Sequence, residues 1–172
     1  MSASEPKTGQ NAKLPVIAQL STGAVLCVFM NGKANIVLLT QNAEFYHKST
    51  NDMDVGPSGM MEGSDPVASA KREIKEETGL EPEVDTGFCE GISYEFDAAA
   101  RSGPHKGSMA HIKKTRRYYL ARISEDDLKR IRLSEEHISW QVLPIDEALK
   151  LSELKEDQKK LLLKLKAYLG AP

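Results

Sequence analysis

The 172-residue sequence lacks several features that would assign it to common functional classes. It has no apolar run approaching the about 20 residues that a membrane-spanning helix needs. Its formal net charge of −2 provides no general attraction to nucleic acid or to an anionic membrane. Residues 1–15 are polar and contain no apolar signal core. We therefore expect no membrane partner and no nucleic-acid partner, and any phosphate recognition must be local.

Cysteine is also scarce, with Cys27 and Cys89 as its two occurrences. Each lies in an apolar or strand-like segment, and their spacing is not that of a metal site. Buried thiols in a reducing compartment are the simplest interpretation, which predicts a cytoplasmic protein. The chain length suits one domain with a sizeable core. We expect a flexible tail over residues 1–15 and a single domain over residues 16–172.

The hydrophobic patterns predict a mixture of strands and helices. Two apolar runs, 23–30 and 35–40, flank Asn31-Gly32, a dipeptide typical of a hairpin turn. Further strands are predicted at 84–96, 115–123 and 138–143, and helices at 66–78 and 124–131. An amphipathic C-terminal helix is predicted from the spacing of Leu154, Gln158, Leu161, Leu165 and Tyr168. The segment 97–107 reads as a mobile loop between strands.

The segment 71–79, KREIKEETG, places three carboxylates within about one helical turn. Glu73, Glu76 and Glu77 have the i, i+3, i+4 spacing that brings helical residues onto one face. Their mutual repulsion must be offset by solvent or by a hard cation such as Mg²⁺ or Mn²⁺, which prefers oxygen ligands. A solvated acidic face and a metal site therefore remain alternatives at this point.

Both ends of this helix are marked in the sequence. Asp65 before Pro66 is typical of an N-cap followed by proline, and Gly79 is typical of a left-handed residue after the last turn. The glycine-containing loop 56–64 precedes the helix and allows close backbone approach to a ligand. Another face of the helix has apolar residues at the spacing of a buried stripe, namely Val67, Ala70 and Ile74.

Residues 56–80 resemble the signature of the Nudix hydrolases, G-x5-E-x7-R-E-U-x-E-E-x-G-U, where U is a bulky aliphatic residue. The second half, 72–80, matches at every specified position. The first half departs from the signature, because Ser58 and Ser64 occupy its glycine and first glutamate positions.

A loop shorter by one residue would instead place Gly59 and Asp65 at those two positions. The resemblance implies an α+β fold, an α-β-α sandwich in which helices flank a mixed β-sheet. It also implies a site for Mg²⁺ or Mn²⁺. Its predicted residues are Gly59, Glu73, Glu76 and Glu77. Arg72 would orient one of these glutamates by an ion pair, with Glu76 within reach.

Two further segments, 114–120 (KTRRYYL) and 131–137 (IRLSEEH), resemble the diadenosine tetraphosphate hydrolase branch of that family. The resemblance implies a Nudix-type pyrophosphohydrolase that cleaves a phosphoanhydride bond, most simply in a dinucleoside polyphosphate. Glu136 is then the candidate general base or additional ligand, and Glu135 is the alternative. Monomer and homodimer both remain open.

Several residues have both a substrate-binding and a plainer interpretation. Lys114 and Arg116 share one side of an alternating strand, where they could contact phosphate or face solvent. Tyr94 could stack on an adenine or belong to the core or a sheet edge. His137 could form a hydrogen bond with a ligand, but it is most simply a structural histidine whose hydrogen bonds are satisfied, and Trp140 is most simply a core residue.

Two other functions remain open. ADP-ribose or another nucleotide sugar is the alternative substrate, because Pro57-Ser58-Gly59 resembles the P-A-G entry of enzymes with that substrate. A nucleotide-binding Nudix module without catalysis is the non-enzyme alternative.

Overall fold

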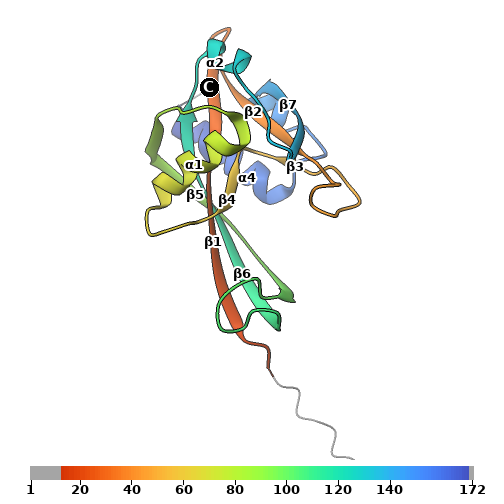
Figure 1. Ribbon diagram of the computed structural model, residues 1–172. Helices are drawn as coiled ribbons and strands as arrows, with labels where there is room; N and C mark the ends of the chain where they lie inside the picture. Colours follow the sequence, from red (N-terminus) through yellow and green to blue (C-terminus); the bar gives the residue numbers. More distant parts are fainter. Residues whose placement is uncertain (1–12, 171–172) are drawn as a thin grey trace, which may run out of the picture.

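The computed structural model describes residues 13–170, and Figure 1 shows their path. Over this range the chain forms a seven-stranded mixed sheet of order β3-β2-β1-β6-β5, with β4 paired to β1 and β7 paired to β2. The strands are β1 (Val16–Met30), β2 (Lys33–Gln41), β3 (Met53–Asp54), β4 (Ser58–Met60), β5 (Val84–Ala99), β6 (Met109–Arg122) and β7 (His137–Pro144). The helices are α1 (Pro66–Thr78), α2 (Glu125–Lys129), α3 (Ile145–Ala148) and α4 (Glu156–Tyr168).

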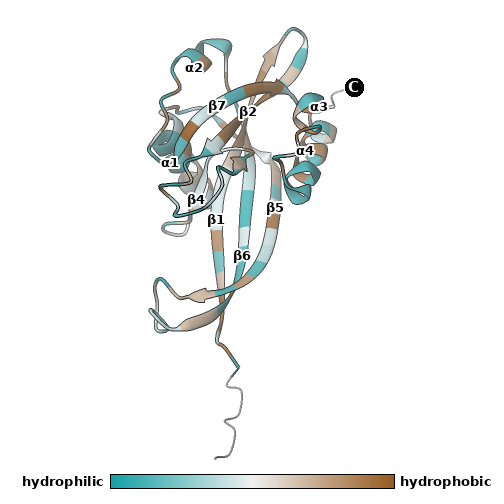
Figure 2. Cartoon of the chain, turned by 90° about the vertical axis from the view of Figure 1, so that its right-hand side faces the viewer, coloured by the Kyte–Doolittle hydropathy of each residue, from teal (hydrophilic) through white to brown (hydrophobic). Residues whose placement is uncertain are grey.

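Helices cover both faces of the sheet, with α1 on one side and α3 and α4 on the other (Figure 2). One core joins Leu120 of β6 to Leu161 of α4, and the other joins Leu26 of β1 to Ile74 of α1. The predicted sandwich with a mixed sheet is therefore confirmed.

The β1–β2 hairpin forms at the predicted turn. Asn31 and Gly32 have φ angles of 54° and 71°, which suits a two-residue turn that matches the twist of the strands. The most central pairing is parallel and joins β1 to β6, so that Val25 faces Leu120. The antiparallel hairpin and this parallel ladder together make the sheet mixed.

Three strands extend well beyond the body of the protein and form a projecting arm (Figure 1). The arm consists of the first part of β1, the end of β5 and the start of β6. The sequence prediction was wrong for the ends of these strands, because β5 continues to Ala99 and β6 already begins at Met109, so that residues 100–108 remain as the loop. Ala110 and Ile112 pack beneath Ala100 in a small cluster, which gives these strand ends a core of their own.

The helix over Pro66–Thr78 has the predicted bounds. The Asp65 carboxylate accepts hydrogen bonds from the backbone N–H groups of Val67 and Ala68, at 3.0 and 3.2 Å. Gly79 has a φ of 75° and closes the C-terminus. These caps fix the start and the end of the helix, and thus the position of its carboxylates.

Other predicted elements need adjustment. The helix predicted for 124–131 covers only Glu125–Lys129, with Ser124 as its N-cap. Leu154 is buried but precedes α4, and Tyr168 is 43% exposed rather than part of the buried stripe.

Cys27 is buried as expected, whereas Cys89 is exposed, so the prediction for the second thiol was wrong. Cys89 follows a register shift in β5 that begins after Asp85. Trp140 packs, half-buried, against the core on the α1 side. Residues 1–12, most of the predicted tail, lie outside the described part of the chain. None of the helices within residues 13–170 is both long and apolar enough to cross a bilayer.

Candidate active site

The three glutamates of α1 do not share one environment. Glu73 and Glu77 are buried, with 6% and 2% exposure, whereas the Glu76 side chain is 56% exposed. Successive helical residues are separated by roughly 100°, so Glu76 and Glu77 project to opposite sides of Glu73. The expectation of a common face therefore holds for the pair Glu73 and Glu77 and was too broad for Glu76.

Arg72 connects this helix to the loop in front of it. Its guanidinium lies 2.9 Å from Glu73 Oε1 and 3.3 Å from Glu76 Oε2. It also donates a hydrogen bond to the carbonyl of Met60 on β4, at 3.1 Å. The predicted ion pair with Glu76 is thus present, and a closer one with Glu73 accompanies it. The forked guanidinium can make these contacts together because its donors are planar and divergent.

Gly59 on β4 lies against the Glu73 carboxylate, and a Cβ atom at this position would overlap that carboxylate. Ser58 does not take this place, so the contact agrees with the alignment in which the loop is one residue shorter. In that alignment Asp65 occupies the first glutamate position, and here it caps α1. A side chain is therefore excluded at the glycine position for a steric reason.

Burial raises the pKa values of Glu73 and Glu77 well above those of exposed glutamates. Burial, with Glu136 and Glu73 nearby, raises the pKa of Glu77 to about 10. Burial likewise raises the pKa of Glu73 to about 7, despite the attraction of Arg72. Glu136 is half-buried and faces this group, whereas Glu135 is exposed. The geometry therefore favours Glu136 over Glu135 as the additional carboxylate.

The donor set fits a hard divalent cation. Glu77 Oε2 is buried and has no hydrogen-bond partner, and its carboxylate neighbours repel it. Among residues 13–170 no three His, Cys, Asp or Glu side chains already converge as a metal-ligand set. Glu73, Glu77 and Glu136 nevertheless supply the oxygen ligands that Mg²⁺ and Mn²⁺ prefer, beside the backbone of Gly59.

A buried histidine and aspartate lie directly behind Glu77. His137 at the start of β7 places Nε2 at 3.1 Å from Asp54 Oδ2, and its Nδ1 lies 3.9 Å from Glu77 Oε2. Gln41 donates to the same Asp54 carboxylate at 3.0 Å. His137 is buried, but only its Nε2 has a hydrogen-bond partner, so the prediction of a structural histidine with satisfied hydrogen bonds holds for one of its two nitrogens. Sequence reasoning missed Asp54 and Gln41, because β3 has only two residues and carries no motif.

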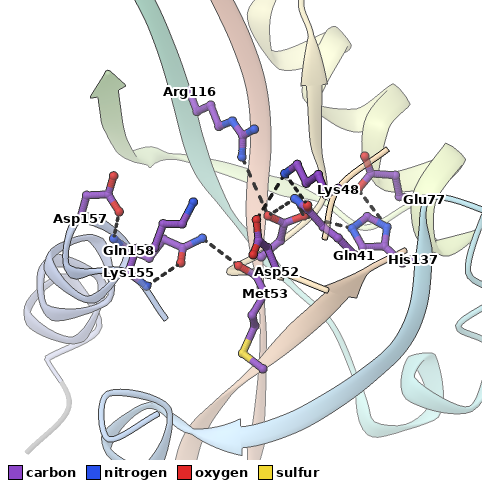
Figure 3. Close-up of polar contacts among 11 residues, drawn as sticks. Gln41, Lys48, Asp52, Met53, Glu77, Arg116, His137, Lys155, Asp157 and Gln158 are labelled. Carbon is purple, nitrogen blue, oxygen red and sulfur yellow. Dashed lines mark hydrogen bonds and ion pairs between the residues drawn. The ribbon is translucent and has the colours of Figure 1, made fainter. Parts of the chain in front are cut away.

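Asp54 also lines a pocket of about 380 Å³, and Figure 3 shows several of the residues around it. Its wall includes residues from β2, β3, β5, β6 and α4, among them Gln41, Lys48, Tyr94, Arg116, Tyr118 and Gln158. Asp54 lines this pocket and contacts His137, which lies against Glu77, so a chain of contacts connects the pocket to the buried carboxylates. A ligand in the pocket could reach toward both cations and carboxylates.

The basic residues of β6 alternate as predicted. Lys114 pairs with Tyr94 and Arg116 with Ile92 across β5, so both cations share the face of the pocket. Lys113 is exposed on the opposite face and lies 3.6 Å from Glu95. Burial and the positive charges of Arg116, Arg101 and Lys48 lower the pKa of Lys114 to about 8. Such a concentration of positive charge is suited to a polyphosphate.

Tyr94 lines the pocket and is the only one of the three predicted substrate-binding residues with an aromatic ring. The Arg116 guanidinium lies 5.7 Å from its ring centre, and Phe96 stacks on it at 5.8 Å. Tyr94 is half-buried, so part of the ring remains accessible. The structure thus places all three predicted substrate residues together at one face of the sheet.

The loop 42–52 adds residues that the sequence did not reveal. Burial and the carboxylates of Glu136, Glu77 and Asp54 raise the pKa of the Tyr46 hydroxyl, which places this tyrosine beside the acidic group. The Lys48 ammonium lies 3.0 Å from Gln41 Oε1, at the pocket. A loop between strands is a common place for binding residues, which was the only available signal.

Known proteins resemble this chain over most of its length. The family model described as the NUDIX domain matches residues 20–165. The chain belongs to the Nudix family. It carries the signature glutamates and the arginine on a capped helix, and it is a Nudix-type pyrophosphohydrolase.

Two curated relatives have the same name, asymmetrical bis(5′-nucleosyl)-tetraphosphatase. The mouse protein is 31% identical over 126 residues, which cover 73% of this chain and 75% of the relative. The rat protein is 35% identical over 101 residues, covering 58% and 61%.

Among solved structures, the C. elegans Ap4A hydrolase binary complex has a TM-score of 0.68 at 23% identity, covering 90% of this chain and 99% of that one. The NUDIX domain of Shewanella oneidensis NrtR complexed with ADP-ribose has a TM-score of 0.57 at 16% identity, covering 96% and 94%. At these identities the likeness supports the Nudix fold.

Proposed function

We propose that this Nudix enzyme hydrolyses a phosphoanhydride bond in a dinucleoside polyphosphate such as diadenosine tetraphosphate, with Mg²⁺ or Mn²⁺ as cofactor, in the cytoplasm. The observation that carries the proposal is the cationic face formed by Lys114 and Arg116, which meets the buried acidic group of Glu73 and Glu77 across Asp54. A long polyphosphate chain needs both kinds of group. The names of the mouse and rat relatives give independent support.

Each residue has a distinct task in this proposal. Glu73 and Glu77, with the backbone of Gly59 and a contribution from Glu76, would hold the cation, whose chemistry is to neutralise phosphate charge and lower the pKa of a bound water. Arg72 fixes Glu73 and Glu76 by its ion pairs.

On the substrate side, Arg116 and Lys114 would hold phosphate oxygens, and Tyr94 would stack on a nucleobase. Glu136 would accept the proton of the attacking water, because it faces the buried carboxylates from the opposite element. Phosphoryl transfer requires mainly positioning and charge stabilisation, which this arrangement supplies.

A panel of nucleotides tests the proposal. The purified protein is incubated with Mg²⁺ and diadenosine tetraphosphate, ADP-ribose, nucleotide sugars or ATP, and the products are separated by chromatography. We expect the dinucleoside polyphosphate to be cleaved fastest, with a mononucleotide as one product. Faster cleavage of ADP-ribose would contradict the substrate assignment while leaving the reaction type intact. Tight nucleotide binding without any cleavage would instead identify a binding module.

A further inference from the structure

Asp54 is a buried carboxylate whose charge must be offset by polar neighbours. It is 7% exposed at the end of β3 and faces three polar side chains. Gln41 Nε2 donates to both of its oxygens at 3.0 Å, His137 Nε2 lies at 3.1 Å and Arg116 Nη1 at 3.9 Å. A buried charge without such partners would be strongly destabilising. The position of Asp54 therefore fixes the positions of the groups around it.

The contact with His137 determines how that ring is oriented. A carboxylate oxygen accepts hydrogen bonds, so the Nε2–H group of His137 donates a hydrogen bond to Asp54 Oδ2. The ring is 1% exposed and has no other side-chain hydrogen bond, which leaves Nδ1 facing Glu77 Oε2. At 3.9 Å these atoms are in packing contact and too far apart for a hydrogen bond. His137 thus limits where the Glu77 carboxylate can turn.

The contact with Arg116 acts on the substrate side. The Arg116 side chain is 27% exposed, and its guanidinium lies 3.9 Å from Asp54 Oδ1 and 5.7 Å from the centre of the Tyr94 ring. In Figure 3, Glu77 and His137 lie on one side of the cluster of dashed contacts and Arg116 lies on another. The Asp54 carboxylate therefore has two sets of contacts, which we call its two arms. The first arm runs through His137 to Glu77, and the second arm is the contact with Arg116 at the pocket.

We propose that Asp54 acts on both halves of the active site: as a positioning residue, through His137, it orients the Glu77 carboxylate toward a divalent cation, and directly it competes with substrate phosphate for Arg116. The inference rests on the proposed function, in which Glu77 holds the cation and Arg116 holds phosphate. It adds a residue that is part of neither the Nudix motif nor the two segments that resemble the tetraphosphate hydrolases. Partners behind metal ligands typically change metal affinity by about 10–100-fold when they are removed.

The two arms predict opposite effects for Asp54→Asn. Mn²⁺ binding, measured without nucleotide from the electron paramagnetic resonance signal of the free ion, should weaken by about 10–100-fold because Glu77 loses its orientation. Binding of inorganic tripolyphosphate in EDTA, measured by calorimetry, should become several-fold tighter, because Arg116 no longer has a competing carboxylate. A variant that had merely lost its fold would lose both affinities.

Two further variants separate the arms from general charge effects. Asp52→Asn removes the same charge two residues away, where Asp52 contacts Lys48 and Thr50 rather than His137 or Arg116. It should leave Mn²⁺ affinity close to that of the parent. His137→Gln interrupts only the first arm, so it should weaken Mn²⁺ binding and leave tripolyphosphate binding unchanged.

The outcomes are distinguishable. If Asp54→Asn binds Mn²⁺ as the parent does, or changes no more than Asp52→Asn, the proposal is overturned. If Asp54→Asn does not fold, unchanged Mn²⁺ affinity in folded His137→Gln overturns it equally. A parent that binds Mn²⁺ but cleaves no nucleotide would contradict the proposed function. The Mn²⁺ affinities of the variants would still decide whether Asp54 positions Glu77. A parent that binds no Mn²⁺ would contradict both.

Discussion

The Arg72 guanidinium lies 2.9 Å from the carboxylate of Glu73, the residue that follows it in the sequence. Neighbouring helical residues project in directions that differ by roughly 100°, so such a pair requires Arg72 to fold back along the helix. The carbonyl of Met60 holds it there with a hydrogen bond of 3.1 Å. The pair therefore connects the position of Glu73 to the position of strand β4.

Arg72→Lys should lower turnover more than it lowers stability. An ammonium group cannot reproduce the divergent contacts to Glu73, Glu76 and the Met60 carbonyl. Turnover of diadenosine tetraphosphate should fall while the melting temperature changes little. Lys71→Arg, an exposed substitution on the same helix, serves as the control. Equal turnover in both variants would show that Arg72 does not position the carboxylates.

Glu77→Gln should abolish most activity and preserve the fold. Removing a cation ligand should cost at least as much as removing a supporting group, which is about 10–100-fold. The amide also removes the cost of holding a proton on this buried carboxyl at neutral pH, so the metal-free variant should melt no lower than the parent. Initial rates over a Mg²⁺ series and a thermal melt in EDTA check both statements. Unchanged turnover would refute the assignment of Glu77 to the cation.

The metal-free protein should lose stability as the pH rises. Glu73 and Glu77 have raised pKa values, about 7 and about 10, in the folded state. The unfolded chain releases these protons near its ordinary glutamate pKa of about 4.3, whereas the folded chain retains them. Between those values the unfolded state binds fewer protons, so unfolding becomes more favourable as the pH increases.

Thermal melts in EDTA from pH 5 to pH 8 check this expectation, and Glu77→Gln should show a weaker decline. Mn²⁺ should raise the melting temperature more at pH 8 than at pH 5, because it replaces protons at the same carboxylates. A melting temperature that rises over this range without metal would contradict the raised pKa values of Glu73 and Glu77.

Ile74→Asp should unfold the protein or destabilise it severely. Ile74 is fully buried between α1 and the sheet, and the substitution buries an unpaired charge and leaves a cavity. Losses above about 4 kcal/mol are typical of such changes. Denaturant melts should show the loss, and Lys71→Asp on the exposed side should stay close to the parent. A melting curve of Ile74→Asp that matches that of the parent would mean that Ile74 does not lie on the buried face of α1.

Neutralising Lys114 and Arg116 together to Gln should raise KM for diadenosine tetraphosphate. Each charge-assisted contact to phosphate contributes roughly 1–3 kcal/mol, and both cations lie on the pocket face of β6. ADP-ribose has fewer phosphates, so its KM should depend less on this pair. The matched control is the pair Lys113 and Arg117 on the other face of the same strand. Equal KM changes for both double variants would refute a specific phosphate contact.

Local sequence patterns predicted the elements whose stabilising contacts are local. Helix α1 was found with its bounds because Asp65 and Gly79 cap it through neighbouring backbone groups. The hairpin turn at Asn31 and Gly32 was found for the same reason. The signature residues on α1 were found because their spacing is fixed by the helix itself.

Elements that depend on distant partners were not predictable in this way. Strands β3 and β4 have two and three residues, and they exist only because β2 and β1 supply their hydrogen bonds. The roles of Asp54 and Tyr46 follow from contacts with residues far along the chain. The extension of β5 and β6 into the arm was also missed, because these strand ends are stabilised by pairing with each other, as Asp97 does with His111.

The parallel pairing of β1 with β6 has a consequence for folding during synthesis. Ala24 pairs with Tyr119, so β1 leaves the ribosome before β6 and lacks this partner until the whole of helix α1 has been made. Long-range parallel pairing is slow, and an unpaired strand edge invites association with other chains. The nascent protein should therefore depend on chaperone protection over this interval, and a circular permutant that starts after β4 should place β6 before β1 and change that dependence.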